Sequence, residues 1–438
     1  MTKSLHSFRA SEVPSSVLER LLTWIDAAPS PYHAAHNACT DLVDVGFTKF
    51  GVDELWGDSD RVVVSWGGVV VAAAFGNRIN PDRLRFRLVG AHTDSPNLRV
   101  KPNPDVGRAG YRQLGVEVYG GVLLNSWLDR DLGLSGRVVV QNGVSQETLL
   151  LKVDRPVLRV AQLAIHLDRE VNEGLKLDRQ SHLSPIWGLG DVDEGGFRSF
   201  VAEELNVDSS EVRSWDVMCH DLTASTVLGR DRELYAAPRI DNLASCHAAV
   251  EALQQIETPT DDTISVVALF DHEEIGSESS SGARGPMLAN ALERLATTRS
   301  VTRDQFLRAL TRSWCVSADG AHAVHPNYVD RHDPEHHVVL NGGPVIKLNA
   351  NVRYATDAES GALFQSACRT AGVPFQQYAH RTDLVCGSTI GPITAAQLGM
   401  SVVDVGSAQL SMHSAREMGG SADPHYLTSA LVSFLASE

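Results

Sequence analysis

Residues 263–269 form an apolar run with the length and the β-branched composition of a buried strand, and they lead directly into acidic residues. Glu273 and Glu274 stand side by side just after the end of this predicted strand. In an open α/β sheet, ligands bind at the carboxyl ends of the strands. Because an isolated pair of glutamates is usually a solvated acidic turn, a functional interpretation requires similar residues at the ends of other elements.

Four other segments also bring ligand-forming side chains to the ends of apolar runs or to the start of a predicted helix. They carry His92 with Asp94, Asp241, Asp319 and His413. His92 and Asp94 are two residues apart, so they share one face of an extended chain. Each residue alone fits a turn, a helix cap or an ordinary histidine. Their repetition at the ends of strands predicts one shared site.

The side chains in these segments favour a metal site. They comprise two histidines, two aspartates and one glutamate, with Glu273 left over. Imidazole and carboxylate groups suit Zn²⁺, and a pair of ions needs a bridging carboxylate. The site is not a helical His-Glu-x-x-His motif, because no second histidine follows His272 at helical spacing. We therefore expect two divalent ions per subunit, with Zn²⁺ favoured and Mn²⁺ or Co²⁺ chemically acceptable.

Six spaced motifs carry a family resemblance. They are GAHTDSP at 90–96, RIDN at 239–242, DHEEIGS at 271–277, SADGAHAVHPN at 317–327, GPVIKLN at 343–349 and MHS at 412–414. In this order the motifs resemble those of aspartyl aminopeptidases, the M18 metallopeptidases. The resemblance spans nearly the whole chain.

The resemblance implies a role for each candidate residue. One ion would be held by His92 and Asp319, the other by Glu274 and His413, and Asp241 would bridge them. Glu273 would act as the general base on a metal-bridged hydroxide and then return the proton to the leaving amine. Asp94 would orient the site, either through the ligand His92 or through Glu273.

The resemblance also implies a preference for peptides with an N-terminal Asp or Glu. A side-chain carboxylate requires a fixed cation or dense donors, and the resemblance places Lys347 and Tyr354 in that pocket. From residue type alone, these two would be an ordinary strand lysine and a packed tyrosine. His322 and His166 are further candidates for binding the oxyanion of the transition state. His166 lies far in sequence from the other residues, so it could reach a site only through folding or from another subunit.

Length and patterning predict two domains. At 438 residues the chain exceeds a typical single core. Alternating helices and strands at 1–96 and 237–438 predict a discontinuous α/β catalytic domain, with a central mixed sheet flanked by helices as in dinuclear-metal aminopeptidases. Within the first domain, the residue pattern predicts a helix over 15–37, a hairpin of strands at 61–66 and 69–74, and a C-terminal helix that starts near Asp423. Glycine-punctuated strands at 97–236, among them one at 121–124, predict a β-rich insertion. The resemblance implies that this insertion serves dimerisation and assembly of a homo-oligomer, a dodecamer built from dimers.

Composition disfavours some classes of binding partner and indicates a cellular compartment. A formal charge of −16, from 38 basic and 54 acidic residues, disfavours nucleic acid and anionic membranes as partners. No apolar run is long enough to span a membrane, and Met1–His6 lacks the core of a signal peptide. Six scattered cysteines fit reduced thiols. These features predict a cytoplasmic enzyme.

Three alternative functions remain open from the sequence. The same metal set could serve a dinuclear deacylase or carboxypeptidase acting on an acyl amino acid. The enzyme could be a broad-specificity aminopeptidase without an acidic preference. The chain could also be a non-enzymatic assembly or cargo protein, although the intact set of ligands and Glu273 argues against a decayed site.

Overall fold

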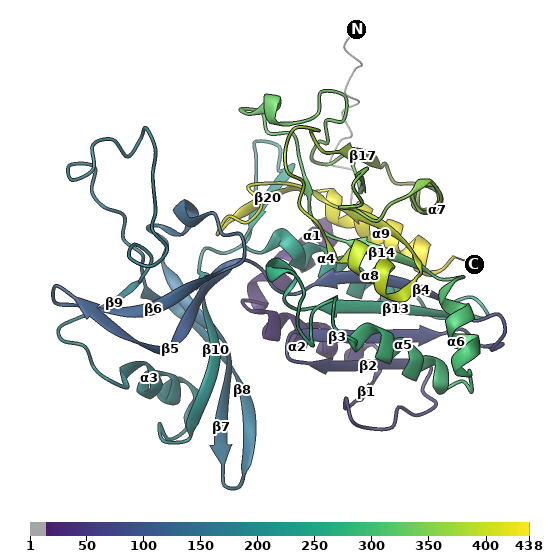
Figure 1. Ribbon diagram of the computed structural model, residues 1–438, viewed down its shortest axis with the longest axis horizontal. Coiled ribbons are helices and arrows are strands. Elements are labelled where there is room, and N and C mark those ends of the chain that lie inside the picture. The colour runs from purple at the N-terminus through teal and green to yellow at the C-terminus, as the bar shows by residue number, and fades with distance from the viewer. Residues whose placement is uncertain (1–14, 438) are drawn as a thin grey trace.

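The computed structural model describes residues 15–437, which form two lobes built on separate β-sheets (Figure 1). Residues 1–6, which are expected to lack the core of a signal peptide, lie outside the described part. The larger lobe contains a mixed sheet of nine strands. In spatial order they are β1 (Thr48–Phe50), β2 (Arg61–Trp66), β3 (Val69–Phe75), β13 (Thr263–Phe270), β4 (Arg85–His92), β14 (Trp314–Ala318), β18 (Ser401–Gly406), β16 (Val345–Leu348) and β17 (Gln376–Ala379).

The four central strands, β13, β4, β14 and β18, run parallel. Their side chains alternate between two apolar cores: Val89 and Val267 face one, while Leu88 and Val266 face the other. Helices cover both faces of the sheet, as expected for buried parallel strands. On the first face lie α1 (Ser15–Ala27), α2 (Pro31–Asp44), α4 (Ile240–Gln255), α7 (Ala358–Ala371) and α9 (Asp423–Leu435); on the second lie α5 (Met287–Thr297), α6 (Arg303–Leu310) and α8 (Ile390–Leu398). This arrangement confirms the predicted mixed α/β architecture.

The second lobe is a six-stranded sheet in which every pairing is antiparallel. Its strands, in spatial order, are β8 (Ser145–Leu158), β7 (Leu132–Asn142), β10 (Val212–Asp221), β5 (Asn97–Arg108), β6 (Tyr111–Tyr119) and β9 (Ile186–Leu189). One helix, α3 (Gly196–Leu205), packs Phe197 and Val201 into an apolar core of its own. The described residues of this lobe therefore have a hydrophobic core separate from those of the nine-stranded sheet.

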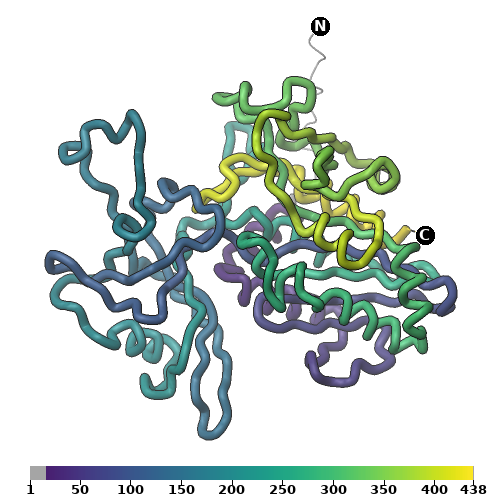
Figure 2. The backbone as a smooth tube through the Cα atoms, viewed as in Figure 1, coloured from purple at the N-terminus to yellow at the C-terminus, as the bar shows by residue number. Residues whose placement is uncertain are grey.

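A third, five-stranded sheet joins distant parts of the chain. It contains β11 (Thr226–Leu228), β12 (Leu234–Ala237), β20 (Glu417–Gly420), β19 (Ala408–Leu410) and β15 (Ala321–His322). β12 pairs antiparallel with β20, so the chain returning from the second lobe is paired with a segment near the C-terminus. Figure 2 shows this yellow segment between the two lobes.

Several local predictions are confirmed. The hairpin predicted at 61–66 and 69–74 is the antiparallel pair β2 and β3. The C-terminal helix predicted from Asp423 is α9. The helical pattern over 15–37 contains a break, because α1 ends at Ala27 and α2 begins at Pro31. Pro29 and Pro31 lack the N–H groups that a continuous helix needs.

One predicted strand, at 121–124, is wrong. Gly120 has a φ of 75°, which turns the chain out of β6, and a short 3₁₀ helix, η2, follows at Leu124–Trp127. The N–H of Leu123 donates to the carbonyl of His413 at 3.1 Å instead of joining a strand ladder. Over residues 15–437, no helix has both the length and the apolar character needed to cross a bilayer.

Close packing between β18 and the end of β14 gives a first prediction. A Cβ atom added at Gly406 would lie 1.6 Å from the carbonyl oxygen of Asp319, so Gly406→Ala must displace backbone. We expect it to lower the free energy of unfolding by about 1–3 kcal/mol, the usual cost of overpacking. The control is Gly361→Ala in α7, whose added methyl group would meet Thr356 at an ordinary 3.5 Å. Denaturant unfolding should show this control unchanged or more stable, and equal losses in both variants would contradict the packing argument.

Candidate metal centre

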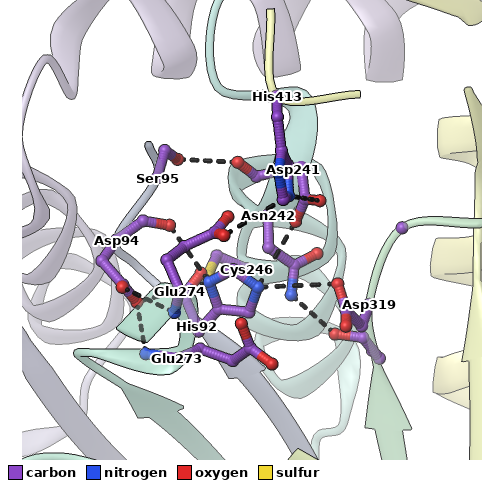
Figure 3. A network of polar contacts seen from close by, with 12 residues as sticks. His92, Asp94, Ser95, Asp241, Asn242, Cys246, Glu273, Glu274, Asp319 and His413 are labelled. Atoms are coloured by element: carbon purple, nitrogen blue, oxygen red, sulfur yellow. Dashed lines mark hydrogen bonds and ion pairs between the residues drawn. The ribbon is translucent and has the colours of Figure 1, made fainter. Parts of the chain in front are cut away.

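Six of the predicted site residues lie together at the carboxyl edge of the nine-stranded sheet (Figure 3). Parallel strands end at the same edge, which explains why residues far apart in sequence meet there. The six residues are His92 at the end of β4, Asp241 at the start of α4, Glu273 and Glu274 in the 3₁₀ helix η3 (Glu273–Ile275) after β13, Asp319 after β14, and His413 between β19 and β20.

The two carboxylate oxygens of Asp241 face different histidines. Oδ1 lies 3.3 Å from Nε2 of His92, and Oδ2 lies 3.6 Å from Nε2 of His413. Each histidine also has a second carboxylate beside it. Asp319 Oδ1 is 3.5 Å from His92 Nε2, and Glu274 Oε2 is 3.3 Å from His413 Nε2. These contacts define two pairs of candidate ligands, His92 with Asp319 and His413 with Glu274, and Asp241 lies between the pairs.

Both histidines are oriented by backbone carbonyls. Nδ1 of His92 lies 3.0 Å from the carbonyl of Asp94, and Nδ1 of His413 lies 3.0 Å from the carbonyl of Gly121. A carbonyl can only accept, so each Nδ1 carries the proton and each Nε2 can offer a lone pair to the centre. This is the usual arrangement around ligating histidines.

The donor set fits divalent cations. His92, Asp241 and Glu274 each offer one ligand atom, and these atoms lie within 4.8 Å of one another. Oε1 of Glu274 is buried without a hydrogen-bond partner. An unpartnered carboxylate oxygen is costly in a protein interior, and a bound cation would remove that cost.

Burial and the crowding of negative charge shift the pKa values of the acidic and histidine side chains at this site. Burial raises the pKa of Glu274 well above its usual value, and the nearby charge of Asp241 adds to the effect. Burial also raises the pKa of Glu273 to about 8, assisted by Asp319. For His92, burial lowers the pKa, but the carboxylates of Asp241 and its neighbours outweigh burial and raise it well above the usual range. Excess negative charge of this kind is balanced by bound cations.

Asp94 contacts both His92 and the backbone of Glu273, the two groups through which it was expected to orient the site. Its Oδ1 lies 3.4 Å from Nδ1 of His92. Its two oxygens also accept the backbone N–H groups of Glu273 and Glu274, each at 3.1 Å. The hydroxyl of Tyr119 donates to Asp94 at 2.7 Å. Asp94 therefore fixes the start of η3, and Tyr119 connects it to the second lobe.

Lys347 is buried in β16, and its side chain lies next to Asp319. Its Nζ donates to the carbonyls of Asp319 and Gly320, at 3.3 and 3.1 Å, and lies 3.9 Å from Oδ2 of Asp319. The ammonium also lies 5.0 Å from the centre of the Tyr354 ring, a cation–π distance. The two residues predicted to form a substrate pocket are thus adjacent to each other and to the metal centre.

The structure places the two remaining candidates differently. His322, on β15, is exposed, but protein surrounds much of its ring. That desolvation, together with the charge of Lys347, lowers its pKa to about 4, which keeps the imidazole neutral. His166 is exposed on the segment between β8 and β9 of the second lobe. Among the described residues it makes no hydrogen bond or ion pair with the residues around Asp241.

Three supporting residues were not among the sequence predictions: Ser95, Tyr119 and Glu417. The hydroxyl of Ser95 donates to the carbonyl of Asp241 at 2.6 Å. The carboxylate of Glu417 accepts the N–H groups of Asp241 and His413. Burial raises the pKa of Glu417 to about 8, with a further contribution from Asp241. Ser95 lies within the motif at 90–96 and Glu417 follows the motif at 412–414, but only the fold shows what these two side chains contact.

Comparisons with known proteins agree with this centre. Residues 24–435 match the family described as "Aminopeptidase I zinc metalloprotease (M18)". A "Probable M18 family aminopeptidase 2" of Streptomyces coelicolor is 51% identical over 420 residues, which cover 95% of this chain and 96% of the relative. The protein of the same name from Mycobacterium leprae is 46% identical over 430 residues, covering 97% and 100% of the two chains.

Solved structures share the fold over almost the entire chain. A chain in the cryo-EM structure of the Ape4 and Nbr1 complex superposes with a TM-score of 0.92 at 33% identity, covering 99% of this chain and 88% of that one. The S. cerevisiae mApe1 dodecamer gives a TM-score of 0.83 at 26% identity, with 96% of each chain covered. Sequence, fold and donor set agree that the chain belongs to the M18 family of zinc metalloproteases and is a metal-dependent aminopeptidase.

Proposed function

We propose that this aminopeptidase removes N-terminal Asp or Glu residues from peptides and uses two divalent ions per subunit. The observation that carries the proposal is the position of Asp241, whose two oxygens face His92 and His413 separately. A carboxylate between two ligand pairs suits a dinuclear site. When bound, two such ions would lower the pKa of a shared water and polarise the scissile carbonyl.

The side chains of this protein would supply proton transfer, positioning of the base and stabilisation of the oxyanion. Glu273 lies beside the ligands without being needed as one, and its carboxylate accepts a proton and returns it to the leaving amine. Asp94 holds the backbone of Glu273 in place. His322, kept neutral, can donate a hydrogen bond to the oxyanion that develops in the transition state.

Substitution of the two adjacent glutamates separates the base from the ligand. Glu273→Gln should retain both ions but lower turnover by on the order of 10²–10⁴-fold, the usual contribution of a positioned acid or base. Glu274→Gln should lose bound metal, because it removes a ligand. Chelation of the wild-type protein should abolish activity, and added Zn²⁺, Mn²⁺ or Co²⁺ should restore it. Metal analysis and aminoacyl-nitroanilide assays measure both effects, and equal metal loss in the two variants would mean that the roles are reversed.

The acidic preference is assigned to Lys347 with Tyr354. Lys347 is a buried cation next to the centre, and a substrate carboxylate reaching it would gain a charge-assisted hydrogen bond. The protein is acidic overall, with a net charge of −16, so a local cation is needed to attract such a side chain. Lys347 also supports the loop of Asp319, and the two roles make different predictions.

Lys347→Met should weaken hydrolysis of N-terminal Asp and Glu by about ten- to a hundredfold more than hydrolysis of neutral residues, since a hydrogen bond to a charged group contributes about 1.5–3 kcal/mol. A panel of aminoacyl substrates measures this selectivity. Lys152→Met provides the control, because Lys152 pairs with Asp154 in the second lobe. A uniform loss across all substrates would instead assign Lys347 to the support of Asp319.

The alternatives make distinct predictions for the same panel. A broad-specificity aminopeptidase would show no preference for acidic residues even in the wild-type protein. A dinuclear deacylase or carboxypeptidase would still act when the α-amine of the substrate is blocked, whereas an aminopeptidase would not. A non-enzymatic assembly or cargo protein would turn over none of the substrates.

We further propose that the chain forms a homo-oligomer, a dodecamer built from dimers, through the β-rich insertion at 97–236. Support comes from the structural similarity to the mApe1 dodecamer. The segment around His166 also exposes large apolar side chains, Leu163, Ile165 and Leu167, at 57%, 50% and 75%. Exposed apolar side chains grouped on one segment favour contact with another protein surface. In such an assembly His166 would enter the site of a neighbouring subunit.

Mixed oligomers test this shared site. Inactive Glu273→Gln subunits co-expressed with His166→Phe subunits should recover part of the activity, because some sites receive both intact residues. Glu273→Gln mixed with Glu274→Gln is the control and should recover none, since both residues belong to one subunit's η3. Absence of recovery in verified mixed oligomers would place His166 outside the chemistry of a neighbouring site.

We also assign the protein to the cytoplasm. All six cysteines are buried and free, as expected in a reducing compartment.

A further inference from the structure

We propose that Glu417 is a positioning residue that sets the spacing of the metal ligands by holding the main chains of Asp241 and His413 together. The inference rests on the proposed two-ion function. Oε2 of Glu417 accepts the N–H of Asp241 at 2.9 Å, and Oε1 accepts the N–H of His413 at 2.7 Å. One carboxylate therefore joins the bridging ligand to a terminal ligand from a distant part of the chain.

The backbone of Asp241 needs such support because it is not helical. Although α4 begins at Ile240, Asp241 has φ −81° and ψ 103°, which lie outside the helical region. Its main-chain groups are instead held by side chains. Ser95 donates to the carbonyl at 2.6 Å, and Glu417 accepts from the N–H. A buried backbone N–H without a partner would be unfavourable.

His413 presents the same requirement. It has a φ of 69°, a left-handed conformation that residues other than glycine adopt only when the surroundings fix it. Its N–H is held by Glu417 and its Nδ1 by the carbonyl of Gly121. The two anchors fix both the position of the residue and the direction of its ring. The imidazole then lies 3.6 Å from the carboxylate of Asp241.

Glu417 itself is held firmly. It begins β20, where it pairs with Ala237 of β12, and only 2% of the residue is exposed. A buried side chain on a paired strand has little freedom to follow movements of the ligands. It can therefore impose their separation, as residues around a metal site often do for the ligands they contact.

A buried carboxylate that accepts two backbone N–H groups could stabilise the fold without affecting the metals, and the chain contains a matched control of that kind. Asp423, at the start of α9, accepts the N–H groups of Asn341 and Gly343 at 2.7 and 3.0 Å. It is 1% exposed and contacts none of the proposed ligands. Asp423→Asn and Glu417→Gln each replace one accepting oxygen with an amide NH₂ that faces a donor.

The test is titration of each metal-free protein with Zn²⁺ against a chromophoric chelator, together with thermal melting of the metal-free forms. Glu417→Gln should weaken at least one of the two sites by about 10–100-fold, the usual effect of removing a group that supports a ligand. Asp423→Asn should bind Zn²⁺ at both sites with the affinity of the wild type. Its melting temperature should nevertheless fall at least as much as that of Glu417→Gln. If Glu417→Gln does not fold, Glu417→Asp keeps the charge but is too short to reach both N–H groups, so it should weaken metal binding in the same way.

Unchanged affinities in a folded Glu417 variant would overturn the inference, as would an equal loss of affinity in Asp423→Asn. The wild-type titration separates this outcome from failure of the proposed function. Two ions bound by the wild type and by Glu417→Gln with equal affinity would overturn only the role of Glu417. Fewer than two ions bound by the wild type would overturn both proposals.

Discussion

Much of the larger lobe serves to place one carboxylate between two histidines. Asp241 can face His92 and His413 only if the end of β4, the start of α4 and the turn before β20 meet at one point. The parallel strands bring His92, Glu274 and Asp319 to a common edge, and the third sheet adds His413. The nearby negative charges are unfavourable in the absence of cations, so the arrangement of these side chains favours the binding of cations.

The residues that meet at the edge of the sheet could be predicted because strand ends leave a clear pattern. An apolar run followed by acidic residues predicts both the strand β13 and the position of Glu273 and Glu274. The same reasoning, extended by the family motifs, places His92, Asp319 and Lys347 within the same region, which the structure brings together. The hairpin of β2 and β3 could be predicted for a similar reason, since its signal is local.

Other features have no local signal. Glu417 contacts Asp241 across 176 positions, and Tyr119 contacts Asp94 across 25. Hydrophobic periodicity cannot indicate such contacts. The signal used for the other residues was an apolar run followed by a histidine or a carboxylate at the expected strand end, and neither Glu417 nor Tyr119 fits that pattern. The segment at 121–124 has strand-like composition, but its backbone is taken up by contacts with His413. Tertiary contacts override local propensity here.

The contact between Gly121 and His413 has a consequence for how the protein folds. The second lobe supplies the carbonyl that orients His413, although the two residues are 292 positions apart in the sequence. The ring of His413 therefore reaches its observed direction only after the second lobe has packed against the turn before β20. Cation binding at this edge of the sheet would then depend on the folding of both lobes.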